Sequence, residues 1–194
     1  MSSAGLVLAS TSPYRKALLE RLGLRFRCIA PDVDEAAFKD RGLAPEELAA
    51  TLARAKADSV ASLVPGAIVI GSDQVCTIDG DVLDKPGDAA TNVAQLRRLA
   101  GHEHRLITAV CIARSDQRRE FVDVTRLKMR PLSAERLAAY VAMDRPFDCA
   151  GGYKLESGGI ALFERIESAD HTAIIGLPLM RLARELEELG LPAF

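Results

Sequence analysis

The stretch Ile68-Val69-Ile70-Gly71-Ser72-Asp73-Gln74-Val75 decides the fold prediction, because it reads as an unbroken apolar strand that ends on a carboxylate. Buried strands normally end on neutral turn residues, whereas open α/β sheets bind their ligands at the carboxyl ends of strands. We therefore expect Asp73 to lie at the carboxyl end of a central strand, inside an active site. The alternative is an Asp73 that only closes a turn.

A second group of polar residues surrounds the predicted start of the first helix. Residues 5–9 read as a short buried strand, and Ser12 is a typical N-cap for a helix that Gly23 would end. The free amide groups and the positive dipole end of this helix would then lie beside Ser10, Ser12 and Arg15. This arrangement predicts a phosphate cradle.

Three further charged residues are expected at the same site: Glu35, Lys56 and Lys85. Glu35 ends an acidic loop, and Lys56 lies on a predicted helix. Lys85 follows a hairpin predicted from Asp79-Gly80, a pair that suits a type I′ turn. Taken singly, each could be a solvated surface residue. Together with Asp73 they resemble a polyphosphate site, in which cations hold charged oxygens while carboxylates bind a divalent ion and activate water.

The rest of the chain alternates helices and strands, with no repeat and no long linker. In chain order we expect a strand over 26–30, a helix over 45–63, a helix over 88–99, strands over 104–113 and 120–129, a helix over 133–143, a glycine-rich segment over 149–159, a strand over 160–166 and a helix that ends at Leu189. The sequence therefore predicts an α/β fold in which residues 1–194 form one two-lobed domain with a shared sheet.

The composition restricts the classes of partner. With 194 residues and a formal net charge of −2, the chain lacks the broad basic surface of a protein that binds nucleic acid through its charge. The composition does not exclude a small anionic ligand, because such a ligand needs only a local cluster of cations. The amino end has no leader pattern and no apolar run is long enough to cross a membrane, so we expect a cytoplasmic protein without a membrane partner.

Several kinds of site are disfavoured by the residues available. The four cysteines are widely spaced and only three histidines are present, so a zinc site or a disulfide framework is not expected. The chain has no G-x-x-x-x-G-K-[ST] run, which excludes a P-loop. The histidines have no nucleophile-elbow partner, which leaves Ser-His-Asp catalysis without support.

The ordered motifs of the chain resemble those of the Maf family, nucleoside triphosphate pyrophosphatases once called septum-formation proteins. These motifs are Leu6-Val7-Leu8-Ala9-Ser10-Thr11-Ser12-Pro13-Tyr14-Arg15, Asp34-Glu35, Ala53-Arg54-Ala55-Lys56-Ala57, Gly71-Ser72-Asp73-Gln74, Lys85-Pro86 and Gly176-Leu177-Pro178-Leu179. Any one of them alone would be weak, but their order and spacing extend the resemblance over essentially the whole chain.

The resemblance implies hydrolysis of a nucleoside triphosphate between its α and β phosphates, with a divalent ion, Mg²⁺ or Mn²⁺, as cofactor. It implies an elongated mixed α/β sheet with flanking helices and two lobes around a central cleft, as in the inosine triphosphate pyrophosphatases. By position, Asp73 matches the general base, and Glu35 with Asp73 would hold the metal. The residues that match or flank the phosphate site are Ser10, Ser12, Arg15, Lys56 and Lys85.

Three positions of the family track the base that is accepted, and here they carry Tyr14, Gln74 and Glu156. The dTTP and UTP subgroup has Arg, Thr and Gln there, so this chain departs from it at all three. Gln74 and Glu156 resemble the subgroup that hydrolyses 7-methyl-GTP, in which an aromatic Trp commonly stands at the position of Tyr14. The resemblance thus implies a 7-methyl-GTP pyrophosphatase, with dTTP and UTP as alternative substrates.

The side-chain chemistry of Glu156 and Tyr14 supports a role in binding the base, independently of the resemblance. Glu156 can accept hydrogen bonds from the N–H donors on the Watson-Crick edge of guanine, and Tyr14 can cover the cationic ring of 7-methylguanine. The alternative is that Tyr14 packs on the first helix and Glu156 is solvated. A different class of function also stays open, a nucleotide-binding regulator of cell division without catalysis. A homodimer is an open alternative for the oligomeric state.

Overall fold

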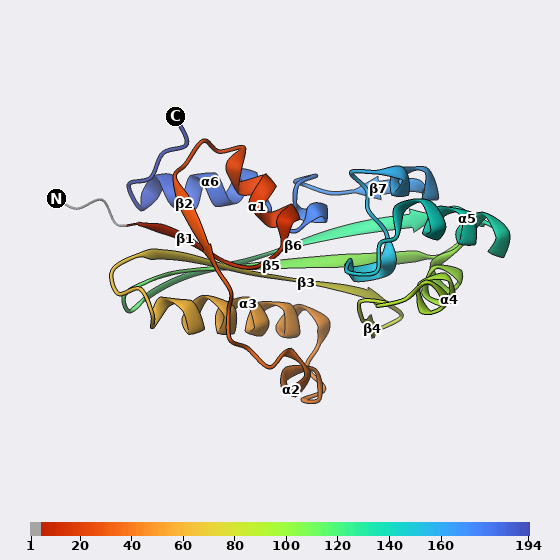
Figure 1. The fold of residues 1–194 in the computed structure, drawn as a ribbon, viewed down its shortest axis with the longest axis horizontal. Helices are drawn as coiled ribbons and strands as arrows, with labels where there is room; N and C mark the ends of the chain where they lie inside the picture. Colours follow the sequence, from red (N-terminus) through yellow and green to blue (C-terminus); the bar gives the residue numbers. More distant parts are fainter. Residues whose placement is uncertain (1–4) are drawn as a thin grey trace. The chain divides into compact units, whose positions relative to one another are not determined.

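A seven-stranded mixed sheet with helices on its faces forms the framework of the structure, a computed structural model that describes residues 5–194 (Figure 1). The expectation that the chain has no leader pattern rests partly on residues 1–4, which lie outside the described residues. The strands follow the order β2-β1-β3-β5-β6-β7, and β4 pairs with β3. β1 is parallel to β2 and β3, whereas the β3–β4 and β6–β7 pairs are antiparallel. The predicted mixed α/β sheet with flanking helices is confirmed.

The strands are β1 (Leu6–Ala9), β2 (Phe26–Ile29), β3 (Ile68–Ile78), β4 (Asp81–Leu83), β5 (Glu103–Arg114), β6 (Gln117–Met129) and β7 (Phe163–Glu167). The α-helices are α1 (Pro13–Glu20), α2 (Glu35–Lys39), α3 (Pro45–Ala61), α4 (Ala89–Leu99), α5 (Ala134–Asp144) and α6 (Leu179–Glu188). Three short 3₁₀ helices complete the set: η1 (Ala150–Gly152), η2 (Gly158–Leu162) and η3 (Ala173–Ile175). Among residues 5–194, no helix is both long enough and apolar enough to span a membrane.

The chain divides into two compact units. Unit 1 holds the residues up to Asp73 together with Thr108–Asp123 and Asp170–Phe194, and unit 2 holds Gln74–Ile107 and Val124–Ala169. The boundaries fall inside β3, β5 and β6, so each of these strands contributes residues to both units. A cleft between lobes stays a prediction.

The core of unit 1 is built on alternate residues of β1 and β3. Leu8 pairs in register with Ile70, and both are fully buried in one apolar cluster with Leu19 of α1 and Leu182 of α6. Side chains at every second position of a strand share a face, so the residues between them point to the opposite side of the sheet. α3 covers that side in unit 1 (Figure 1). Each fully buried leucine or isoleucine contributes about 1.5–3 kcal/mol.

The prediction that Asp73 ends its strand is wrong, because β3 continues to Ile78. The residues after Gln74 are again apolar or β-branched and are buried, so the strand has no reason to stop. The stop comes at the Asp79-Gly80 turn, where both residues have positive φ, 53° and 90°. The predicted hairpin is confirmed, with Cys76 opposite Leu83. Asp73 therefore projects from the middle of a strand.

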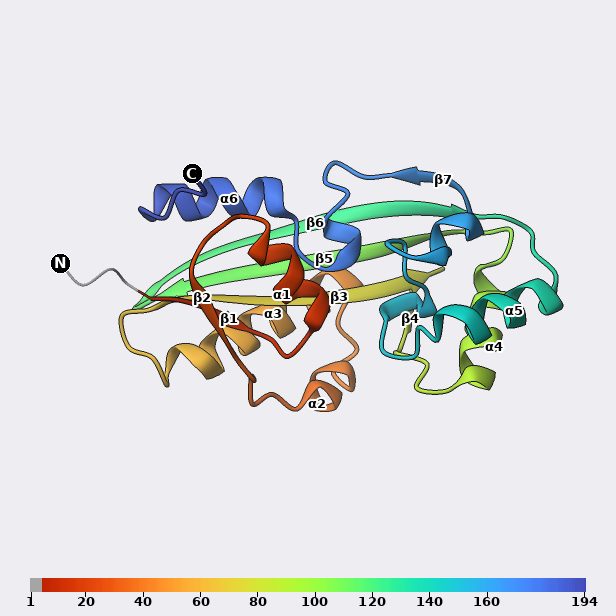
Figure 2. The ribbon, with the colours of Figure 1, turned by 45° about the horizontal axis from the view of Figure 1, so that its top comes forward.

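Two other predicted elements need correction. Glu35 does not lie in a loop but begins α2, because the Asp34 carboxylate accepts hydrogen bonds from the backbone N–H groups of Ala36 and Ala37 at 3.1 and 3.3 Å. α2 packs against α3, as Figure 2 also shows. The strand predicted to begin at residue 160 begins at Phe163, because η2 takes the preceding residues.

Candidate active site

The centre of the candidate site is an ammonium group held by two carboxylates. Lys56 Nζ lies 2.6 Å from Asp73 Oδ1 and 2.6 Å from Glu35 Oε1. Lys56 and Asp73 are each only 6% exposed, whereas Glu35 is partly open to solvent. The three residues come from α3, β3 and α2. The structure thus brings together three of the predicted site residues.

A glycine allows Lys56 and Asp73 to meet. Gly71 and Asp73 face the same side of β3, toward α3. A Cβ atom on Gly71 would lie 2.3 Å from the carbonyl oxygen of Ala53 and 2.6 Å from the backbone nitrogen of Ala57. α3 therefore packs its backbone directly on β3, from Ala53, one turn before Lys56, to Ala57, the residue after it. Any side chain at position 71 would push the helix, and its lysine, away from Asp73.

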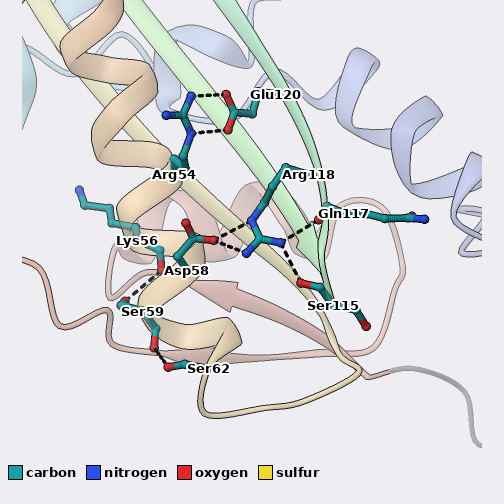
Figure 3. A network of polar contacts seen from close by, with 9 residues as sticks. All are labelled: Arg54, Lys56, Asp58, Ser59, Ser62, Ser115, Gln117, Arg118 and Glu120. Atoms are coloured by element: carbon teal, nitrogen blue, oxygen red, sulfur yellow. Dashed lines mark hydrogen bonds and ion pairs between the residues drawn. The ribbon is translucent and has the colours of Figure 1, made fainter.

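A polar network on the other side of α3 ties the helix to β6 (Figure 3). Arg54 donates to both oxygens of Glu120, at 2.6 and 2.7 Å, and Arg118 donates to Asp58 at 2.7 Å. Lys56 points away from this network (Figure 3). The pairs are exposed, and such surface ion pairs contribute about 0–1 kcal/mol each. These pairs therefore add little to the stability of the fold.

The start of α1 has the geometry that the sequence predicts. Ser12 is the N-cap, and its Oγ accepts a hydrogen bond from the backbone N–H of Arg15 at 3.3 Å. Ser10 is buried, and its Oγ accepts from the N–H of Ser12 at 3.1 Å. Both hydroxyls therefore lie at the helix N-terminus, where backbone N–H groups and the dipole favour an anion.

The Arg15 side chain is oriented by a backbone carbonyl far along the chain. Its Nε donates to the carbonyl oxygen of Gly176 at 3.2 Å. Ser72 Oγ donates to the same oxygen at 2.9 Å. Because Ser72 precedes Asp73 on β3, one carbonyl links the arginine to the strand that carries the predicted base.

The turn that presents this carbonyl is itself highly constrained. Asp170 accepts from both the N–H and the hydroxyl of Thr172, at 2.9 and 2.6 Å, and from the N–H of Met180 at 2.7 Å. It thereby caps α6, which has no side-chain cap at its own N-cap residue, Pro178. Sequence reasoning quoted Gly176 and Ser72 as parts of motifs without giving either a role, and it missed Asp170. The spacing of Asp170 from Thr172, typical of a local capping turn, was the available signal.

Electrostatic interactions link Arg15, at the start of α1, with the carboxylates of Asp73 and Glu35. Burial raises the pKa of Asp73 above its usual range, while the positive charges of Lys56 and Arg15 oppose that rise. Burial likewise lowers the pKa of Arg15, and the charges of Asp73 and Glu35 oppose that change. Asp73 is therefore a carboxylate that takes up a proton more readily than a solvated one, as a general base does.

The remaining predicted residues are placed as follows. Tyr14 is partly buried in the first turn of α1, and Gln74 follows Asp73 on β3, also partly buried. Lys85 and Glu156 are exposed, and both belong to unit 2. A role for Lys85 and Glu156 at the Asp73 site stays a prediction.

The carboxylates also bear on the predicted divalent ion. In the part of the chain described, residues 5–194, no three or more His, Cys, Asp or Glu side chains gather into a metal site. Glu35 and Asp73 nevertheless converge on one cationic group, the Lys56 ammonium. Mg²⁺ is commonly held by one or two carboxylates together with substrate phosphates and water. The pair therefore fits an ion that arrives with a polyphosphate.

Comparison with known proteins gives one consistent result. A family model described as "Maf-like protein" matches residues 5–189. The 7-methyl-GTP pyrophosphatase of Bdellovibrio bacteriovorus is 42% identical over 98% of this chain and 100% of its own length. That of Bordetella avium is 49% identical over 96% of this chain and 93% of its own. Among solved structures, a HAM1 protein from Coxiella burnetii is 16% identical, with a TM-score of 0.54 over 95% of this chain and 99% of that one, and supports the fold alone.

Proposed function

This chain belongs to the Maf family, and from that premise we propose that it hydrolyses 7-methyl-GTP to 7-methyl-GMP and pyrophosphate. The observation that carries the proposal is the buried contact of Asp73 with Lys56, in a chain whose full-length relatives are named 7-methyl-GTP pyrophosphatases. A proton acceptor held beside cations can activate water and offset the charge of phosphate oxygens, which supports phosphoanhydride hydrolysis.

In the proposed reaction, Asp73 accepts a proton from a water molecule as the water oxygen forms a bond to the α phosphorus. The bond from that phosphorus to the oxygen bridging the α and β phosphates breaks, and pyrophosphate leaves. Lys56 and Arg15 offset the charge of the phosphate oxygens, and the N-terminus of α1 with Ser10 and Ser12 binds a further phosphate.

A divalent ion, Mg²⁺ or Mn²⁺, is part of the proposal. Bound to Glu35 and Asp73, it would supply charge neutralisation for the phosphates. The convergence of the two carboxylates on one ammonium group supports this assignment. We also assign Lys85 to the phosphates, on the resemblance of its motif.

The test of the reaction type is product identification. With Mg²⁺ or Mn²⁺, 7-methyl-GTP is expected to give 7-methyl-GMP and pyrophosphate, because attack at the α phosphorus releases the two outer phosphates together. Chromatography of the nucleotide products and an enzymatic pyrophosphate assay check this. Orthophosphate and a nucleoside diphosphate as the first products would refute the mechanism. Tight binding without turnover would favour the alternative function, a nucleotide-binding regulator of cell division.

Glu156, with Tyr14 and Gln74, is proposed to select the base. Glu156→Gln is expected to lower kcat/KM for 7-methyl-GTP at least several-fold, because a well-formed bidentate contact to a base edge discriminates by about 1–3 kcal/mol. The triple change with Tyr14→Arg and Gln74→Thr should move preference toward dTTP and UTP. Parallel kcat/KM values for 7-methyl-GTP, GTP, dTTP and UTP measure both effects.

The matched control is Glu164→Gln, the same chemical change at an exposed position of β7. It should leave every kcat/KM value unchanged. The 7-methyl-GTP assignment would be abandoned if the unmutated protein preferred dTTP.

A further inference from the structure

Three consecutive residues of the glycine-rich segment are each held by a different element of unit 2. The Gly152 carbonyl accepts from Asn92 Nδ2 of α4 at 2.9 Å. The Tyr153 hydroxyl lies 2.9 Å from Nε2 of His104 on β5. The backbone N–H of Lys154 donates to the hydroxyl of Tyr140 on α5, also at 2.9 Å.

These contacts are buried and fit closely. Asn92 is fully buried, and His104, Tyr153 and Tyr140 are 2%, 4% and 6% exposed. Gly152 has a φ of 71°, and a Cβ there would lie 2.1 Å from Asn92 Nδ2, so only glycine permits this hydrogen bond. The backbone is therefore fixed at Gly152 before it reaches the turn that carries Glu156.

The His104–Tyr153 contact stays uncharged near neutral pH. Burial lowers the pKa of His104 to about 4 and raises that of Tyr153. Phe163 packs edge-on against the Tyr153 ring, with 4.8 Å between ring centroids. A buried neutral pair holds its geometry across the pH range in which a solvated histidine would titrate.

The carbonyl group of Lys154 closes the 154–159 turn. Its oxygen accepts from the N–H groups of Ser157 and Gly159 at 3.2 and 3.0 Å. A Cβ on Gly159 would lie 2.4 Å from the same oxygen. Ser157 Oγ donates to Asp144 Oδ1 of α5 at 2.9 Å. Glu156 is therefore exposed on a short turn whose two sides are both fixed to the rest of unit 2.

We propose that Asn92, His104 and Tyr140 are positioning residues that set base selectivity, by holding the backbone of the 154–159 turn that carries Glu156. The inference rests on the proposed function, in which Glu156 reads the base. A side chain on a backbone that is already fixed loses less conformational entropy when the ligand arrives. Freeing the turn should thus weaken the contact with the base more than the reaction at the phosphates.

Tyr140→Phe tests the inference, because it removes only the hydroxyl that accepts from Lys154. The kcat/KM ratio of 7-methyl-GTP to UTP is expected to fall about threefold or more, because Glu156 would lose part of its contact with the base. In the Glu156→Gln background the same change should cause no further fall, because the residue through which it acts is gone. Equal losses for both nucleotides, or a fall that persists without Glu156, would overturn the inference.

The control is Val141→Ala, a core truncation on the same helix at a residue 2% exposed. It should destabilise the fold but leave the kcat/KM ratio unchanged. If Val141→Ala changed the ratio as much as Tyr140→Phe does, the effect of Tyr140 would come from the stability of the fold alone, and its positioning role would be overturned.

Amide hydrogen exchange gives a readout that needs no activity. In Tyr140→Phe, the amides of Ser157 and Gly159 are expected to exchange faster than in the wild type, and in Val141→Ala they should follow the global change. Unchanged exchange in Tyr140→Phe overturns the inference even where the wild type hydrolyses 7-methyl-GTP. A wild type that hydrolyses no triphosphate instead refutes the proposed function.

Discussion

Asp73→Asn is expected to lower the rate of hydrolysis by about a hundredfold to ten-thousandfold, the usual loss when a positioned general base is removed. The change is nearly isosteric, and the amide oxygen of the new residue can still accept from Lys56, so the fold should persist. Nucleotide affinity should also be largely retained. Pyrophosphate release at saturating 7-methyl-GTP measures the rate, and calorimetry with a non-hydrolysable analogue measures the affinity.

A matched control separates this effect from a general change of charge. Asp116→Asn makes the same replacement in the exposed turn between β5 and β6 and should leave turnover unchanged. An Asp73→Asn protein with near-normal turnover would remove Asp73 from the mechanism.

Lys56→Met is expected to weaken both binding and rate, because it removes a cation near the phosphates and leaves Glu35 and Asp73 without their shared partner. Removing one member of a buried ion pair typically destabilises a protein by about 3–5 kcal/mol. Since Glu35 is partly solvated, we expect the lower end of that range. Lys16→Met is the control, since Lys16 forms an exposed surface pair with Glu20.

The pH dependence of Lys56→Met follows from Asp73. The base works only when ionised, so activity is lost as pH falls through its pKa, which burial already raises. Without the positive charge of Lys56 that pKa rises further, and the acid limb of the kcat/KM profile should move to higher pH. The stability loss should be largest above that pKa and should shrink below it, where the carboxyl group is neutral. An acid limb that stays in place, or that moves to lower pH, would contradict the assignment of Asp73 as the titrating base.

The elements that sequence reasoning placed correctly are those with strong local signals. Ser12 as an N-cap and Asp79-Gly80 as a hairpin turn are decided by the backbone within a few residues, so their prediction needs no tertiary information. The end of β3 was misjudged because Asp73 resembles a strand terminus. A buried carboxylate is tolerated inside the strand because it pairs with Lys56, which lies 17 positions earlier on α3.

The site residues that were missed act through tertiary structure or through the backbone. The Gly176 carbonyl, which orients Arg15, belongs to a group that every residue has, so no residue type marks it. Gly71 was quoted as part of a motif, but its role depends on how closely α3 approaches. Such roles follow from packing between distant segments and become visible only when the fold is known.

The contact at Gly71 also limits how this protein can change over evolutionary time. A side chain there meets backbone atoms of α3, so shrinking a neighbouring side chain would not make room for it. Compensation by a second substitution, the usual route by which cores drift, is thus closed at this position. Base preference can diverge through substitutions elsewhere, whereas a mutation at Gly71 displaces the lysine of the reaction centre. We therefore expect glycine to persist at position 71 even where base preference changes.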